Sequence, residues 1–232
     1  MPKPNKIPKR YQPKGYEILY EDKDIVVGNK EPGYLTVSAL LNKDNTIHSA
    51  LNQYVRKGNP KSHKRVYVVH RLDQATSGVL LFAKSEPVQL FLKDNWSKAK
   101  KYYYAVVHGR LKNKEGLISS YLAEDEDYFI HSSQHKHDGK LAKTGYTVEK
   151  ETARFSLLKI DLLTGRKNQI RVHLADEGHP VVGDTKYGDG NDKHKRLALH
   201  AHSLSFFHPM TGKPVNFEAP IPEYFNKLLD KN

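Results

Sequence analysis

An aspartate between two apolar segments is the residue in this sequence best placed for chemistry. Asp73 follows the potentially cationic His70 and Arg71, and the flanking segments 66–69 and 78–83 are strongly apolar. This pattern predicts two buried strands with Asp73 in the turn between them, at the edge of a core. A partly desolvated carboxylate in such a place can act as a nucleophile or as a base.

A second polar cluster, residues 164–174, follows about a hundred residues later and contains three cations. The pattern predicts a helix over residues 168–177 on which Arg171 and Leu174 share one face. If Asp73 lies opposite this face, the guanidinium can hold it through two hydrogen bonds and keep it ionised. The alternative is a structural Asp–Arg pair that joins a turn to a helix, and spacing alone favours that alternative.

The charge balance indicates a polyanionic partner. The 232 residues include 38 Lys and Arg against 26 Asp and Glu, which gives a net charge of +12. An excess of cations favours nucleic acid because phosphate contacts release bound counterions. A merely basic soluble protein is the alternative explanation of the charge.

The absence of cysteine excludes disulfides, cysteine-based zinc sites and thiol nucleophiles. No apolar stretch reaches the roughly 20 residues of a membrane span, and the N-terminus lacks the apolar core of a secretory signal. A cytoplasmic protein without a membrane partner is therefore expected.

The chain is expected to form one domain over residues 16–232, preceded by a flexible basic tail, rich in proline and lysine, over residues 1–15. Runs of strands with occasional helices indicate an α+β fold. The segment 123–143 is acidic and then rich in His and Lys, and it is expected to be a loop. The expected strands lie at 16–20, 25–27, 66–69, 78–83, 102–107, 146–148, 155–163, 197–208 and 215–217. Helices are expected after Thr46 and Ser85 and over 168–177.

The two polar clusters resemble the signatures of a known family. Residues 70–78, His-Arg-Leu-Asp-Gln-Ala-Thr-Ser-Gly, are similar to the H-R-L-D-x-x-T-S-G signature of the RluA family of RNA pseudouridine synthases. Residues 164–174 resemble the second signature of that family, commonly T-G-R-T-H-Q-I-R-V-H-L. Lys167 and Asn168 depart from it, which we interpret as variation within a subgroup. The resemblance extends over residues 17–222.

The resemblance implies three catalytic residues. Asp73 falls on the catalytic aspartate of the family. Tyr103 falls on the tyrosine that stacks against the target base. Its neighbours Tyr102 and Tyr104 leave that assignment open by one position, and the spacing to Ala105 and Gly109 favours Tyr103. Arg171 matches the basic residue that pairs with the aspartate.

The same resemblance implies residues that contact the substrate. Leu174 is expected to line the pocket for the base, and Arg71 to help hold RNA with the target nucleotide extruded. Further substrate contacts are expected from His70, Thr76 and Gln169.

The fold implied is that of the pseudouridine synthases: a mixed, largely antiparallel bent sheet with flanking helices and a basic central cleft. The additional N-terminal domain of the S4 type found in many family members is expected to be absent. The implied partner is a structured RNA, ribosomal or transfer, bound by a monomer. The reaction detaches uracil from the sugar and rejoins it through another ring atom, so we expect neither a metal nor an organic cofactor.

Two other classes of function remain open at the level of sequence. The first is an RNA-binding factor that has kept the fold and lost turnover, although Asp73, Tyr103 and Arg171 are all retained. The second is a metal-dependent phosphohydrolase that uses histidines such as His200 and His202 or the 135–138 cluster. No complete set of three or four metal ligands is evident. Sensitivity to chelators would distinguish the hydrolase from the synthase.

Overall fold

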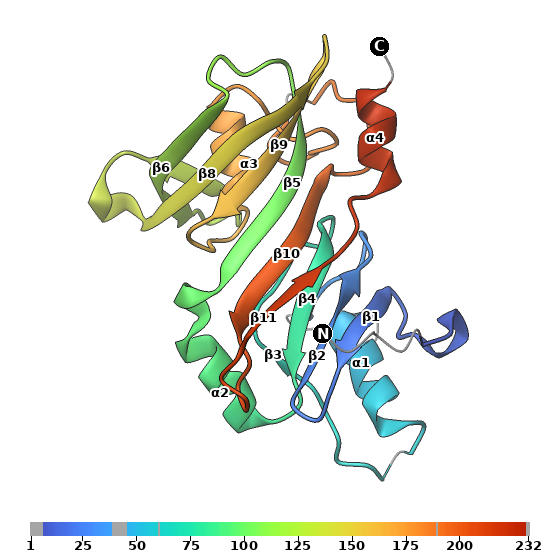
Figure 1. Ribbon diagram of the computed structural model, residues 1–232. Helices are drawn as coiled ribbons and strands as arrows, with labels where there is room; N and C mark the ends of the chain where they lie inside the picture. Colours follow the sequence, from blue (N-terminus) through green and yellow to red (C-terminus); the bar gives the residue numbers. More distant parts are fainter. Residues whose placement is uncertain (1–6, 39–45, 60, 189, 231–232) are drawn as a thin grey trace. The chain divides into compact units, whose positions relative to one another are not determined.

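The computed structural model describes residues 7–38, 46–59, 61–188 and 190–230. The chain divides into two compact units, residues 1–99 with 201–220 and residues 100–200 with 221–232. Figure 1 labels all the elements of the first unit except η1 and η2. The elements of this unit are η1 (Lys9–Tyr11), β1 (Tyr16–Glu21), β2 (Ile25–Lys30), α1 (Ile47–Arg56), β3 (Tyr67–Val68), β4 (Ser77–Ala83), α2 (Glu86–Asp94), η2 (Trp96–Lys98), most of β10 (Leu199–Phe207) and β11 (Pro214–Glu218).

Strand β4 is the centre of the first unit. Its seven residues are all buried, and its neighbours in the sheet are β2 and β10. Because successive side chains of a strand point to opposite faces, β4 packs against a different helix on each side. Phe82 stacks with His48 of α1, whereas Leu81 shares a cluster with Val88 of α2. The two helices therefore cover opposite faces of β4.

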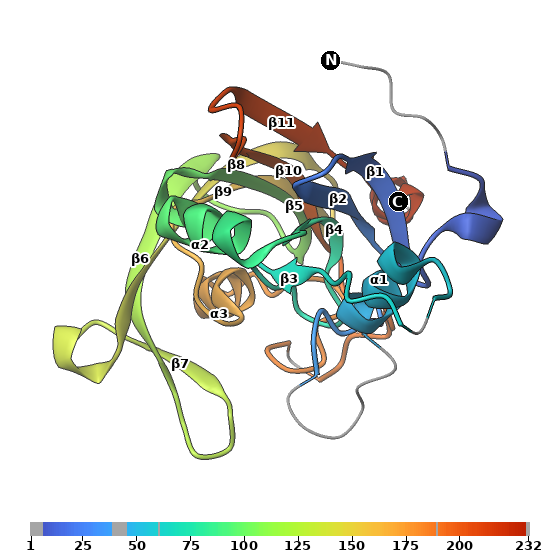
Figure 2. The same ribbon diagram turned by 90° about the horizontal axis from the view of Figure 1, so that it is seen from below.

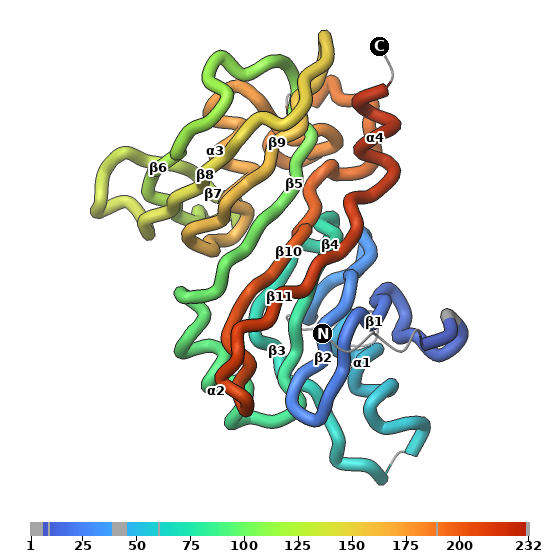
Figure 3. The backbone as a smooth tube through the Cα atoms, in the orientation of Figure 1, coloured from blue at the N-terminus to red at the C-terminus, as the bar shows by residue number. Residues whose placement is uncertain are grey.

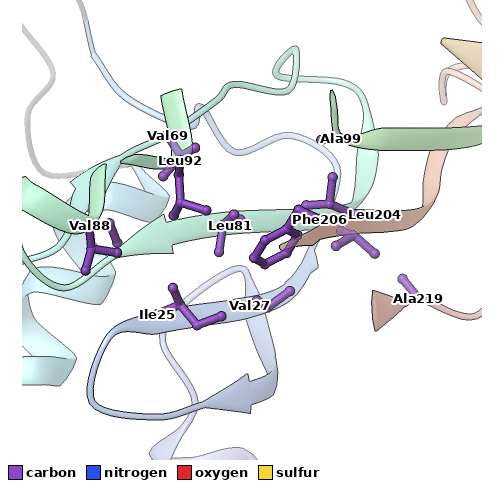
Figure 4. Close-up of a cluster of buried hydrophobic side chains, with 12 residues drawn as sticks. Ile25, Val27, Val69, Leu81, Val88, Leu92, Ala99, Leu204, Phe206 and Ala219 are labelled. Atoms are coloured by element: carbon purple, nitrogen blue, oxygen red, sulfur yellow. The ribbon is translucent and has the colours of Figure 1, made fainter. Parts of the chain in front are cut away.

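Figure 4 shows the cluster on the α2 side. Ile25 and Val27 of β2, Leu81 of β4 and Phe206 of β10 pack there with α2. Burying each large aliphatic or aromatic side chain contributes about 1.5–3 kcal/mol relative to exposing it. This core gives the turn before β4 a rigid support.

The sequence signal at the start of helix α1 is confirmed. Thr46 is the N-cap, and its hydroxyl accepts a hydrogen bond from the backbone N–H of Ser49 (3.1 Å). An N-cap threonine satisfies one of the backbone donors that a helix start leaves unpaired. The helix ends at Arg56, and the C-cap residue Lys57 adopts the left-handed conformation (φ 51°).

The second unit is built on five strands in the order β5-β9-β8-β6-β7, and each neighbouring pair is antiparallel. Figure 3 follows the backbone through β5, β9 and β8 as near neighbours. The elements are β5 (Lys100–His108), β6 (Glu115–Glu124), β7 (Ile130–Ser133), η3 (Lys136–Asp138), β8 (Lys140–Glu151), β9 (Phe155–Leu162), α3 (Gln169–Asp176) and α4 (Glu223–Leu229).

Helix α3 lies against one face of the second unit's strands, and Figure 2 shows it beside the β6–β7 hairpin. Val172 of the helix packs with Leu122, Ile130 and Ala142 of β6, β7 and β8. The helix ends before Gly178, which adopts a left-handed backbone (φ 80°) and whose N–H donates to the carbonyl of Ala175. The expected helix over 168–177 is thus confirmed with slightly shorter bounds.

In both units the paired strands and flanking helices form the expected α+β fold. The expectation of a loop over 123–143 was wrong in part, because this segment contains the hairpin strand β7 and the start of β8. Of the segment expected as a tail, residues 7–15 contact the rest of the first unit: the Gln12 side chain accepts from the N–H of Ile18 (2.8 Å), and the Gly15 carbonyl from that of Glu31 (2.9 Å). Residues 1–6 lie outside the described residues. The domain boundary at residue 16 stays a prediction.

None of the helices in the described part of the chain has the length and apolar character needed to cross a membrane.

Candidate active site

Asp73 lies in the turn between β3 and β4, half-buried, and its carbonyl accepts a hydrogen bond from the N–H of Thr76 (3.1 Å). One side chain bonds to both backbone polar groups of the preceding residue, Leu72. The buried hydroxyl of Thr36 accepts from the Leu72 N–H (3.1 Å) and donates to the Leu72 carbonyl (2.9 Å). The backbone that carries Asp73 is therefore anchored to a distant loop.

A second anchor of the Asp73 turn is Lys30, a fully buried cation at the end of β2. Its Nζ donates to the carbonyls of Glu31 (2.9 Å), Tyr34 (2.8 Å) and Gln74 (3.0 Å). Burial lowers the pKa of Lys30 to about 7, and the charge of Asp73 acts in the opposite direction. Lys30 thus joins the residue after Asp73 to the loop that follows β2.

The sequence analysis missed Lys30, although one signal was available. A lysine ends the apolar strand Ile25–Lys30 and is followed closely by Pro32 and Gly33. A charged residue at the end of an otherwise buried strand needs a partner, because an unpaired buried charge is costly. What the sequence cannot supply is the identity of the three carbonyls.

The other predicted residues of this turn differ in exposure. The ring of His70 stacks on Trp96 (centroids 4.5 Å apart), and its Nε2 accepts from the N–H of Leu81 (3.1 Å). Arg71 is exposed. Thr76 is buried, and its hydroxyl has no hydrogen-bond partner among the described residues. Arg71 is therefore the most accessible of the three to a ligand.

In the second unit, strand alternation separates Tyr103 from its neighbours. Tyr103 is buried on β5 and pairs with Ile160 of β9, whose other partner is Tyr146 of β8. Thr144, two residues before Tyr146, points to the same face and lies 2.8 Å from the Nδ1 of His173 on α3. Tyr103 therefore shares the face that α3 covers.

Tyr102 and Tyr104 point to the opposite face of β5. The ring of Tyr102 lies beneath the Nζ of Lys159 (5.3 Å) on β9. Alternation thus identifies Tyr103, the residue that the sequence spacing favours, as the one tyrosine of the three on the α3 face.

Arg171 lies in the first turn of α3, and its guanidinium is bound by a carboxylate that the sequence analysis did not single out. Its Nε and Nη2 donate to the two oxygens of Asp184 at 2.7 Å and 2.8 Å. The Asp184 side chain is fully buried, and that of Arg171 is 11% exposed. Two parallel bonds of this kind fix the plane of the guanidinium.

Asp184 also accepts hydrogen bonds from the backbone of the tight turn that follows it. Its Oδ1 accepts from the N–H groups of Lys186 (2.9 Å) and Tyr187 (3.0 Å). Burial acts to raise the pKa of Asp184, but Arg171 and these two backbone donors outweigh it and lower the pKa below its ordinary value. Asp184 therefore carries a stable negative charge.

Gln169 is fully engaged within the protein. Its Oε1 accepts from the Thr164 hydroxyl (2.8 Å) and the Arg166 N–H (3.0 Å), while its Nε2 donates to the Lys143 carbonyl (3.0 Å) and the Thr144 hydroxyl (2.9 Å). Two of these bonds join the start of α3 to β8, and the other two join it to the segment that precedes the helix. The structure thus gives Gln169 a role in placing the helix.

His173 belongs to the same helix, and its side chain faces the strands. It is completely buried, and its two ring nitrogens bond to the hydroxyls of Ser120 (3.0 Å) and Thr144 (2.8 Å). Burial lowers its pKa to about 4. Leu174, the next residue, is also fully buried.

The two residues that depart from the family signature contact either the β6–β7 hairpin or Tyr187, whose hydroxyl bonds to that hairpin. Lys167 forms an ion pair with Glu124 at the end of β6, and its Nζ lies over the ring of Tyr128 (5.6 Å). Asn168 adopts a left-handed backbone (φ 53°) and accepts from the hydroxyl of Tyr187 (3.2 Å). Both residues thus have local structural partners.

The structure places the predicted residues in two groups. His70, Arg71, Asp73 and Thr76 belong to the turn segment of the first unit, and the group of Tyr103, Gln169, Arg171 and Leu174 belongs to the second unit. The pairing of Arg171 with Asp73 stays a prediction, as does the basic cleft.

One group among the described residues has the spacing of metal ligands: Asp22, Asp24 and His208. The oxygens of Asp22 already accept from the N–H groups of Asp24 and Ile25 and from His208 and Tyr20. These bonds cap the turn between β1 and β2, which accounts for the cluster as structure. The 135–138 segment does not form such a group within the described residues.

The chain matches known proteins over most of its length. Residues 24–176 match the family of RNA pseudouridylate synthases. The chain is 33% identical to the uncharacterized RNA pseudouridine synthase YjbO of Bacillus subtilis, over 94% of this chain and 77% of that protein. It is 35% identical to the ribosomal large subunit pseudouridine synthase C of Buchnera aphidicola, over 92% and 69% of the two chains.

The fold has a solved counterpart in the human RNA pseudouridylate synthase domain containing 4. That structure aligns over 90% of both chains with a TM-score of 0.75 and 24% sequence identity.

Fold and sequence together define an isomerase that acts on RNA. The chain belongs to the RluA-type family of RNA pseudouridine synthases.

Proposed function

We propose that this protein converts a specific uridine of a structured RNA to pseudouridine with Asp73 as the catalytic carboxylate. The observation that supports Asp73 most directly is the anchoring of its turn by the buried Thr36 and Lys30. A catalytic group acts best when its backbone and surroundings are held rigidly before the substrate binds.

The reaction needs no redox partner and no hydrolytic water. The bond between C1′ and N1 of uridine breaks, the uracil turns, and a bond forms between C1′ and C5. The proton on C5 is removed, and N1 gains one, so that product and substrate are isomers. A carboxylate can serve by attacking C1′ or by removing a proton from the sugar. Because the glycosidic bond is buried in a stacked helix, the nucleotide must be extruded at a cost of a few kcal/mol.

The remaining groups have complementary roles in this proposal. Tyr103 stacks on the uracil ring, and Leu174 lines its pocket, which retains the detached base. Arg171 stabilises the ionised form of the catalytic carboxylate. Arg71 helps to hold the RNA with the nucleotide extruded.

The hydrogen bonds of His70 and Gln169 support indirect contributions, through the shape of the turn and of α3. The buried Thr76 lies in the Asp73 turn itself, and a substrate contact by its hydroxyl remains part of the proposal.

Ribosomal RNA is the favoured substrate, with transfer RNA second. Two relatives are named as ribosomal large subunit pseudouridine synthases, C in Buchnera aphidicola and D in Neisseria meningitidis. A ribosomal substrate would place the protein in the cytoplasm.

The test is to map pseudouridines in ribosomal and transfer RNA from cells that lack this protein. Complementation uses the wild type, Asp73→Asn and, as a matched control, Asp94→Asn, which changes an exposed acid at the end of α2. We expect a site that disappears and returns with the wild type and with Asp94→Asn, but not with Asp73→Asn. Purified Asp73→Asn should bind the same RNA within a few-fold of the wild type.

Two results would contradict the proposal. Pseudouridine restored by Asp73→Asn would remove Asp73 from catalysis. No dependent site, together with tight RNA binding by the purified protein, would favour an RNA-binding factor without turnover.

A further inference from the structure

We propose that Asp184 is a positioning residue that orients the guanidinium of Arg171 for catalysis, with the ring of Tyr187 supporting the same guanidinium. The proposal rests on the catalytic role of Arg171 given above. It concerns a residue outside the two signature segments from which the site was predicted.

The first support is the geometry of the pair. Asp184 accepts from both the Nε and the Nη2 of Arg171, so it engages one edge of the planar group. A rigid guanidinium bound along this edge has its remaining Nη1 edge directed as well. A single bond to one nitrogen would leave the group able to rotate.

The second support is the contact between the guanidinium and the ring of Tyr187. The Tyr187 ring lies beneath Arg171, with its centroid 5.2 Å from Cζ. The Tyr187 hydroxyl accepts from the N–H of Ile130 on β7 (3.1 Å) and donates to Asn168 before α3 (3.2 Å). The ring is thus held from two elements, and it adds a second contact to the guanidinium beside the two Asp184 bonds.

The third support is the way Asp184 is itself held. Its Oδ1 also accepts from the N–H groups of Lys186 and Tyr187. These bonds fix the carboxylate in the turn that carries Tyr187. A buried ion pair is by itself weak evidence of a gain in stability, because desolvation of both charges offsets their attraction. A buried pair with two parallel bonds can instead fix the position of its cation, here the guanidinium of Arg171.

The alternative is a purely structural role, in which Asp184 joins the 184–187 turn to α3. The substitution Asp184→Asn separates the two roles. With its amide oxygen in the place of Oδ1, asparagine can still accept from Lys186 and Tyr187. Its NH₂ group then meets the Nε–H of Arg171, donor against donor, and the two-bond contact is lost.

Asp192 provides a matched control in the following segment. Its oxygens accept from the Gly183 N–H (2.6 Å), from His108 (2.8 Å), and from the N–H and ring of His194. Asp192 thus lies in the same region and has several hydrogen bonds, but its ion pairs are with His108 and His194 and not with Arg171. Asp192→Asn therefore tests the general effect of losing such a charge.

The experiment measures the single-turnover rate and the Kd on the RNA that the wild type modifies, for Asp184→Asn, Asp192→Asn, Arg171→Lys and the double variant Arg171→Lys/Asp184→Asn. We expect Asp184→Asn to lower the rate about 10- to 100-fold while Kd changes less than about threefold. Asp192→Asn should stay within about twofold of the wild-type rate. In the Arg171→Lys background, Asp184→Asn should cause little further loss, because residues that act as a unit are not additive.

An NMR arm reports the contact without catalysis. The Nε–H resonance of Arg171, assigned by its loss in Arg171→Lys, should exchange slowly in the wild type and Asp192→Asn and rapidly in Asp184→Asn. Equal rate losses in Asp184→Asn and Asp192→Asn, or full additivity in the double variant, would overturn the positioning role. An unchanged Nε–H resonance in Asp184→Asn would overturn the contact itself. An inactive wild type with the expected NMR result would contradict the proposed function and leave the Arg171–Asp184 contact intact.

Discussion

Buried polar residues of α3 are satisfied by partners outside the helix, and this is the main lesson at the scale of single residues. Gln169 bonds to β8 and to the segment before α3, Arg171 to Asp184, and His173 to two hydroxyls of the sheet. Each such group would be costly if left unpaired, since a buried donor or acceptor without a partner loses about 1–3 kcal/mol. The residues that carry the proposed chemistry are therefore placed by a polar network as well as by apolar packing.

His173 makes a prediction about pH at this scale. Its pKa is near 4 in the folded protein and near the ordinary value of 6.5 in the unfolded chain. Between these values the unfolded chain binds more protons, so stability must fall as pH is lowered from about 6.5 to 4. At 1.36 kcal/mol per pKa unit the loss is of the order of 3 kcal/mol.

Urea unfolding of the wild type, His173→Asn and the control His137→Asn at several pH values checks this prediction. His137 is exposed, so its variant should follow the wild type. His173→Asn should be less stable at pH 7 but show a flatter dependence on pH between 6.5 and 4. The depressed pKa values of Asp22, Asp184 and Asp192 affect stability at lower pH, as these carboxylates become protonated. An unchanged slope in His173→Asn would contradict the assignment.

At the scale of elements, the strand that follows Asp73 depends on a close approach of two backbones. Gly78, the second residue of β4, has φ +116°, and a Cβ at this position would lie 2.6 Å from the backbone nitrogen of Ala201 on β10. A side chain is excluded by conformation and by contact with backbone that cannot move easily. The backbone conformation at Gly78 and its close approach to β10 therefore explain why the first signature has glycine at this position.

Gly78→Ala is expected to destabilise the protein by more than about 3 kcal/mol, because backbone strain of 1–3 kcal/mol adds to the steric conflict. Gly145 of β8 is the matched control, since a Cβ there would meet Asp161 at an ordinary 3.5 Å. Gly145→Ala should change the free energy of unfolding by less than about 1 kcal/mol. Comparison of the urea midpoints of the two variants decides the matter, and equal midpoints would refute the proposed contact.

At the scale of the whole molecule, the net charge of +12 is the property most relevant to RNA. Each phosphate neutralised by Lys or Arg releases counterions. Each such contact therefore contributes about −0.7 to −0.9 to the slope of log K against log salt. This term is independent of the chemistry at Asp73 and of the orientation of Arg171.

We therefore expect RNA binding to weaken steeply with salt, with a slope of about −3 or steeper if four or more phosphates are contacted. Asp73→Asn should keep the same slope even though it loses turnover. Filter binding or fluorescence anisotropy between about 50 and 300 mM salt measures both. A slope near zero would show that phosphate contacts do not dominate the affinity.

Sequence patterns predicted the local elements well where the signals were local. The Thr46 cap of α1, the buried strand Ser77–Ala83 and the end of α3 before Gly178 each depend on residues within a few positions. The segment 123–143 was misread because the β6–β7 pairing is supported by contacts with Lys167 and Tyr187, more than 35 residues away. Polar composition alone does not reveal such support.

The sequence by itself determined the α+β class, the family and the residues proposed to carry the chemistry, because these follow from local periodicity and from two long signatures. Only the tertiary structure decided which tyrosine of β5 faces α3, that Lys30 anchors the turn of Asp73 and that Asp184 binds Arg171. Lys30 and Gln74 are 44 positions apart, and Arg171 and Asp184 are 13 apart. Hydrogen bonds and ion pairs depend on distance and direction in space, which a linear pattern does not contain.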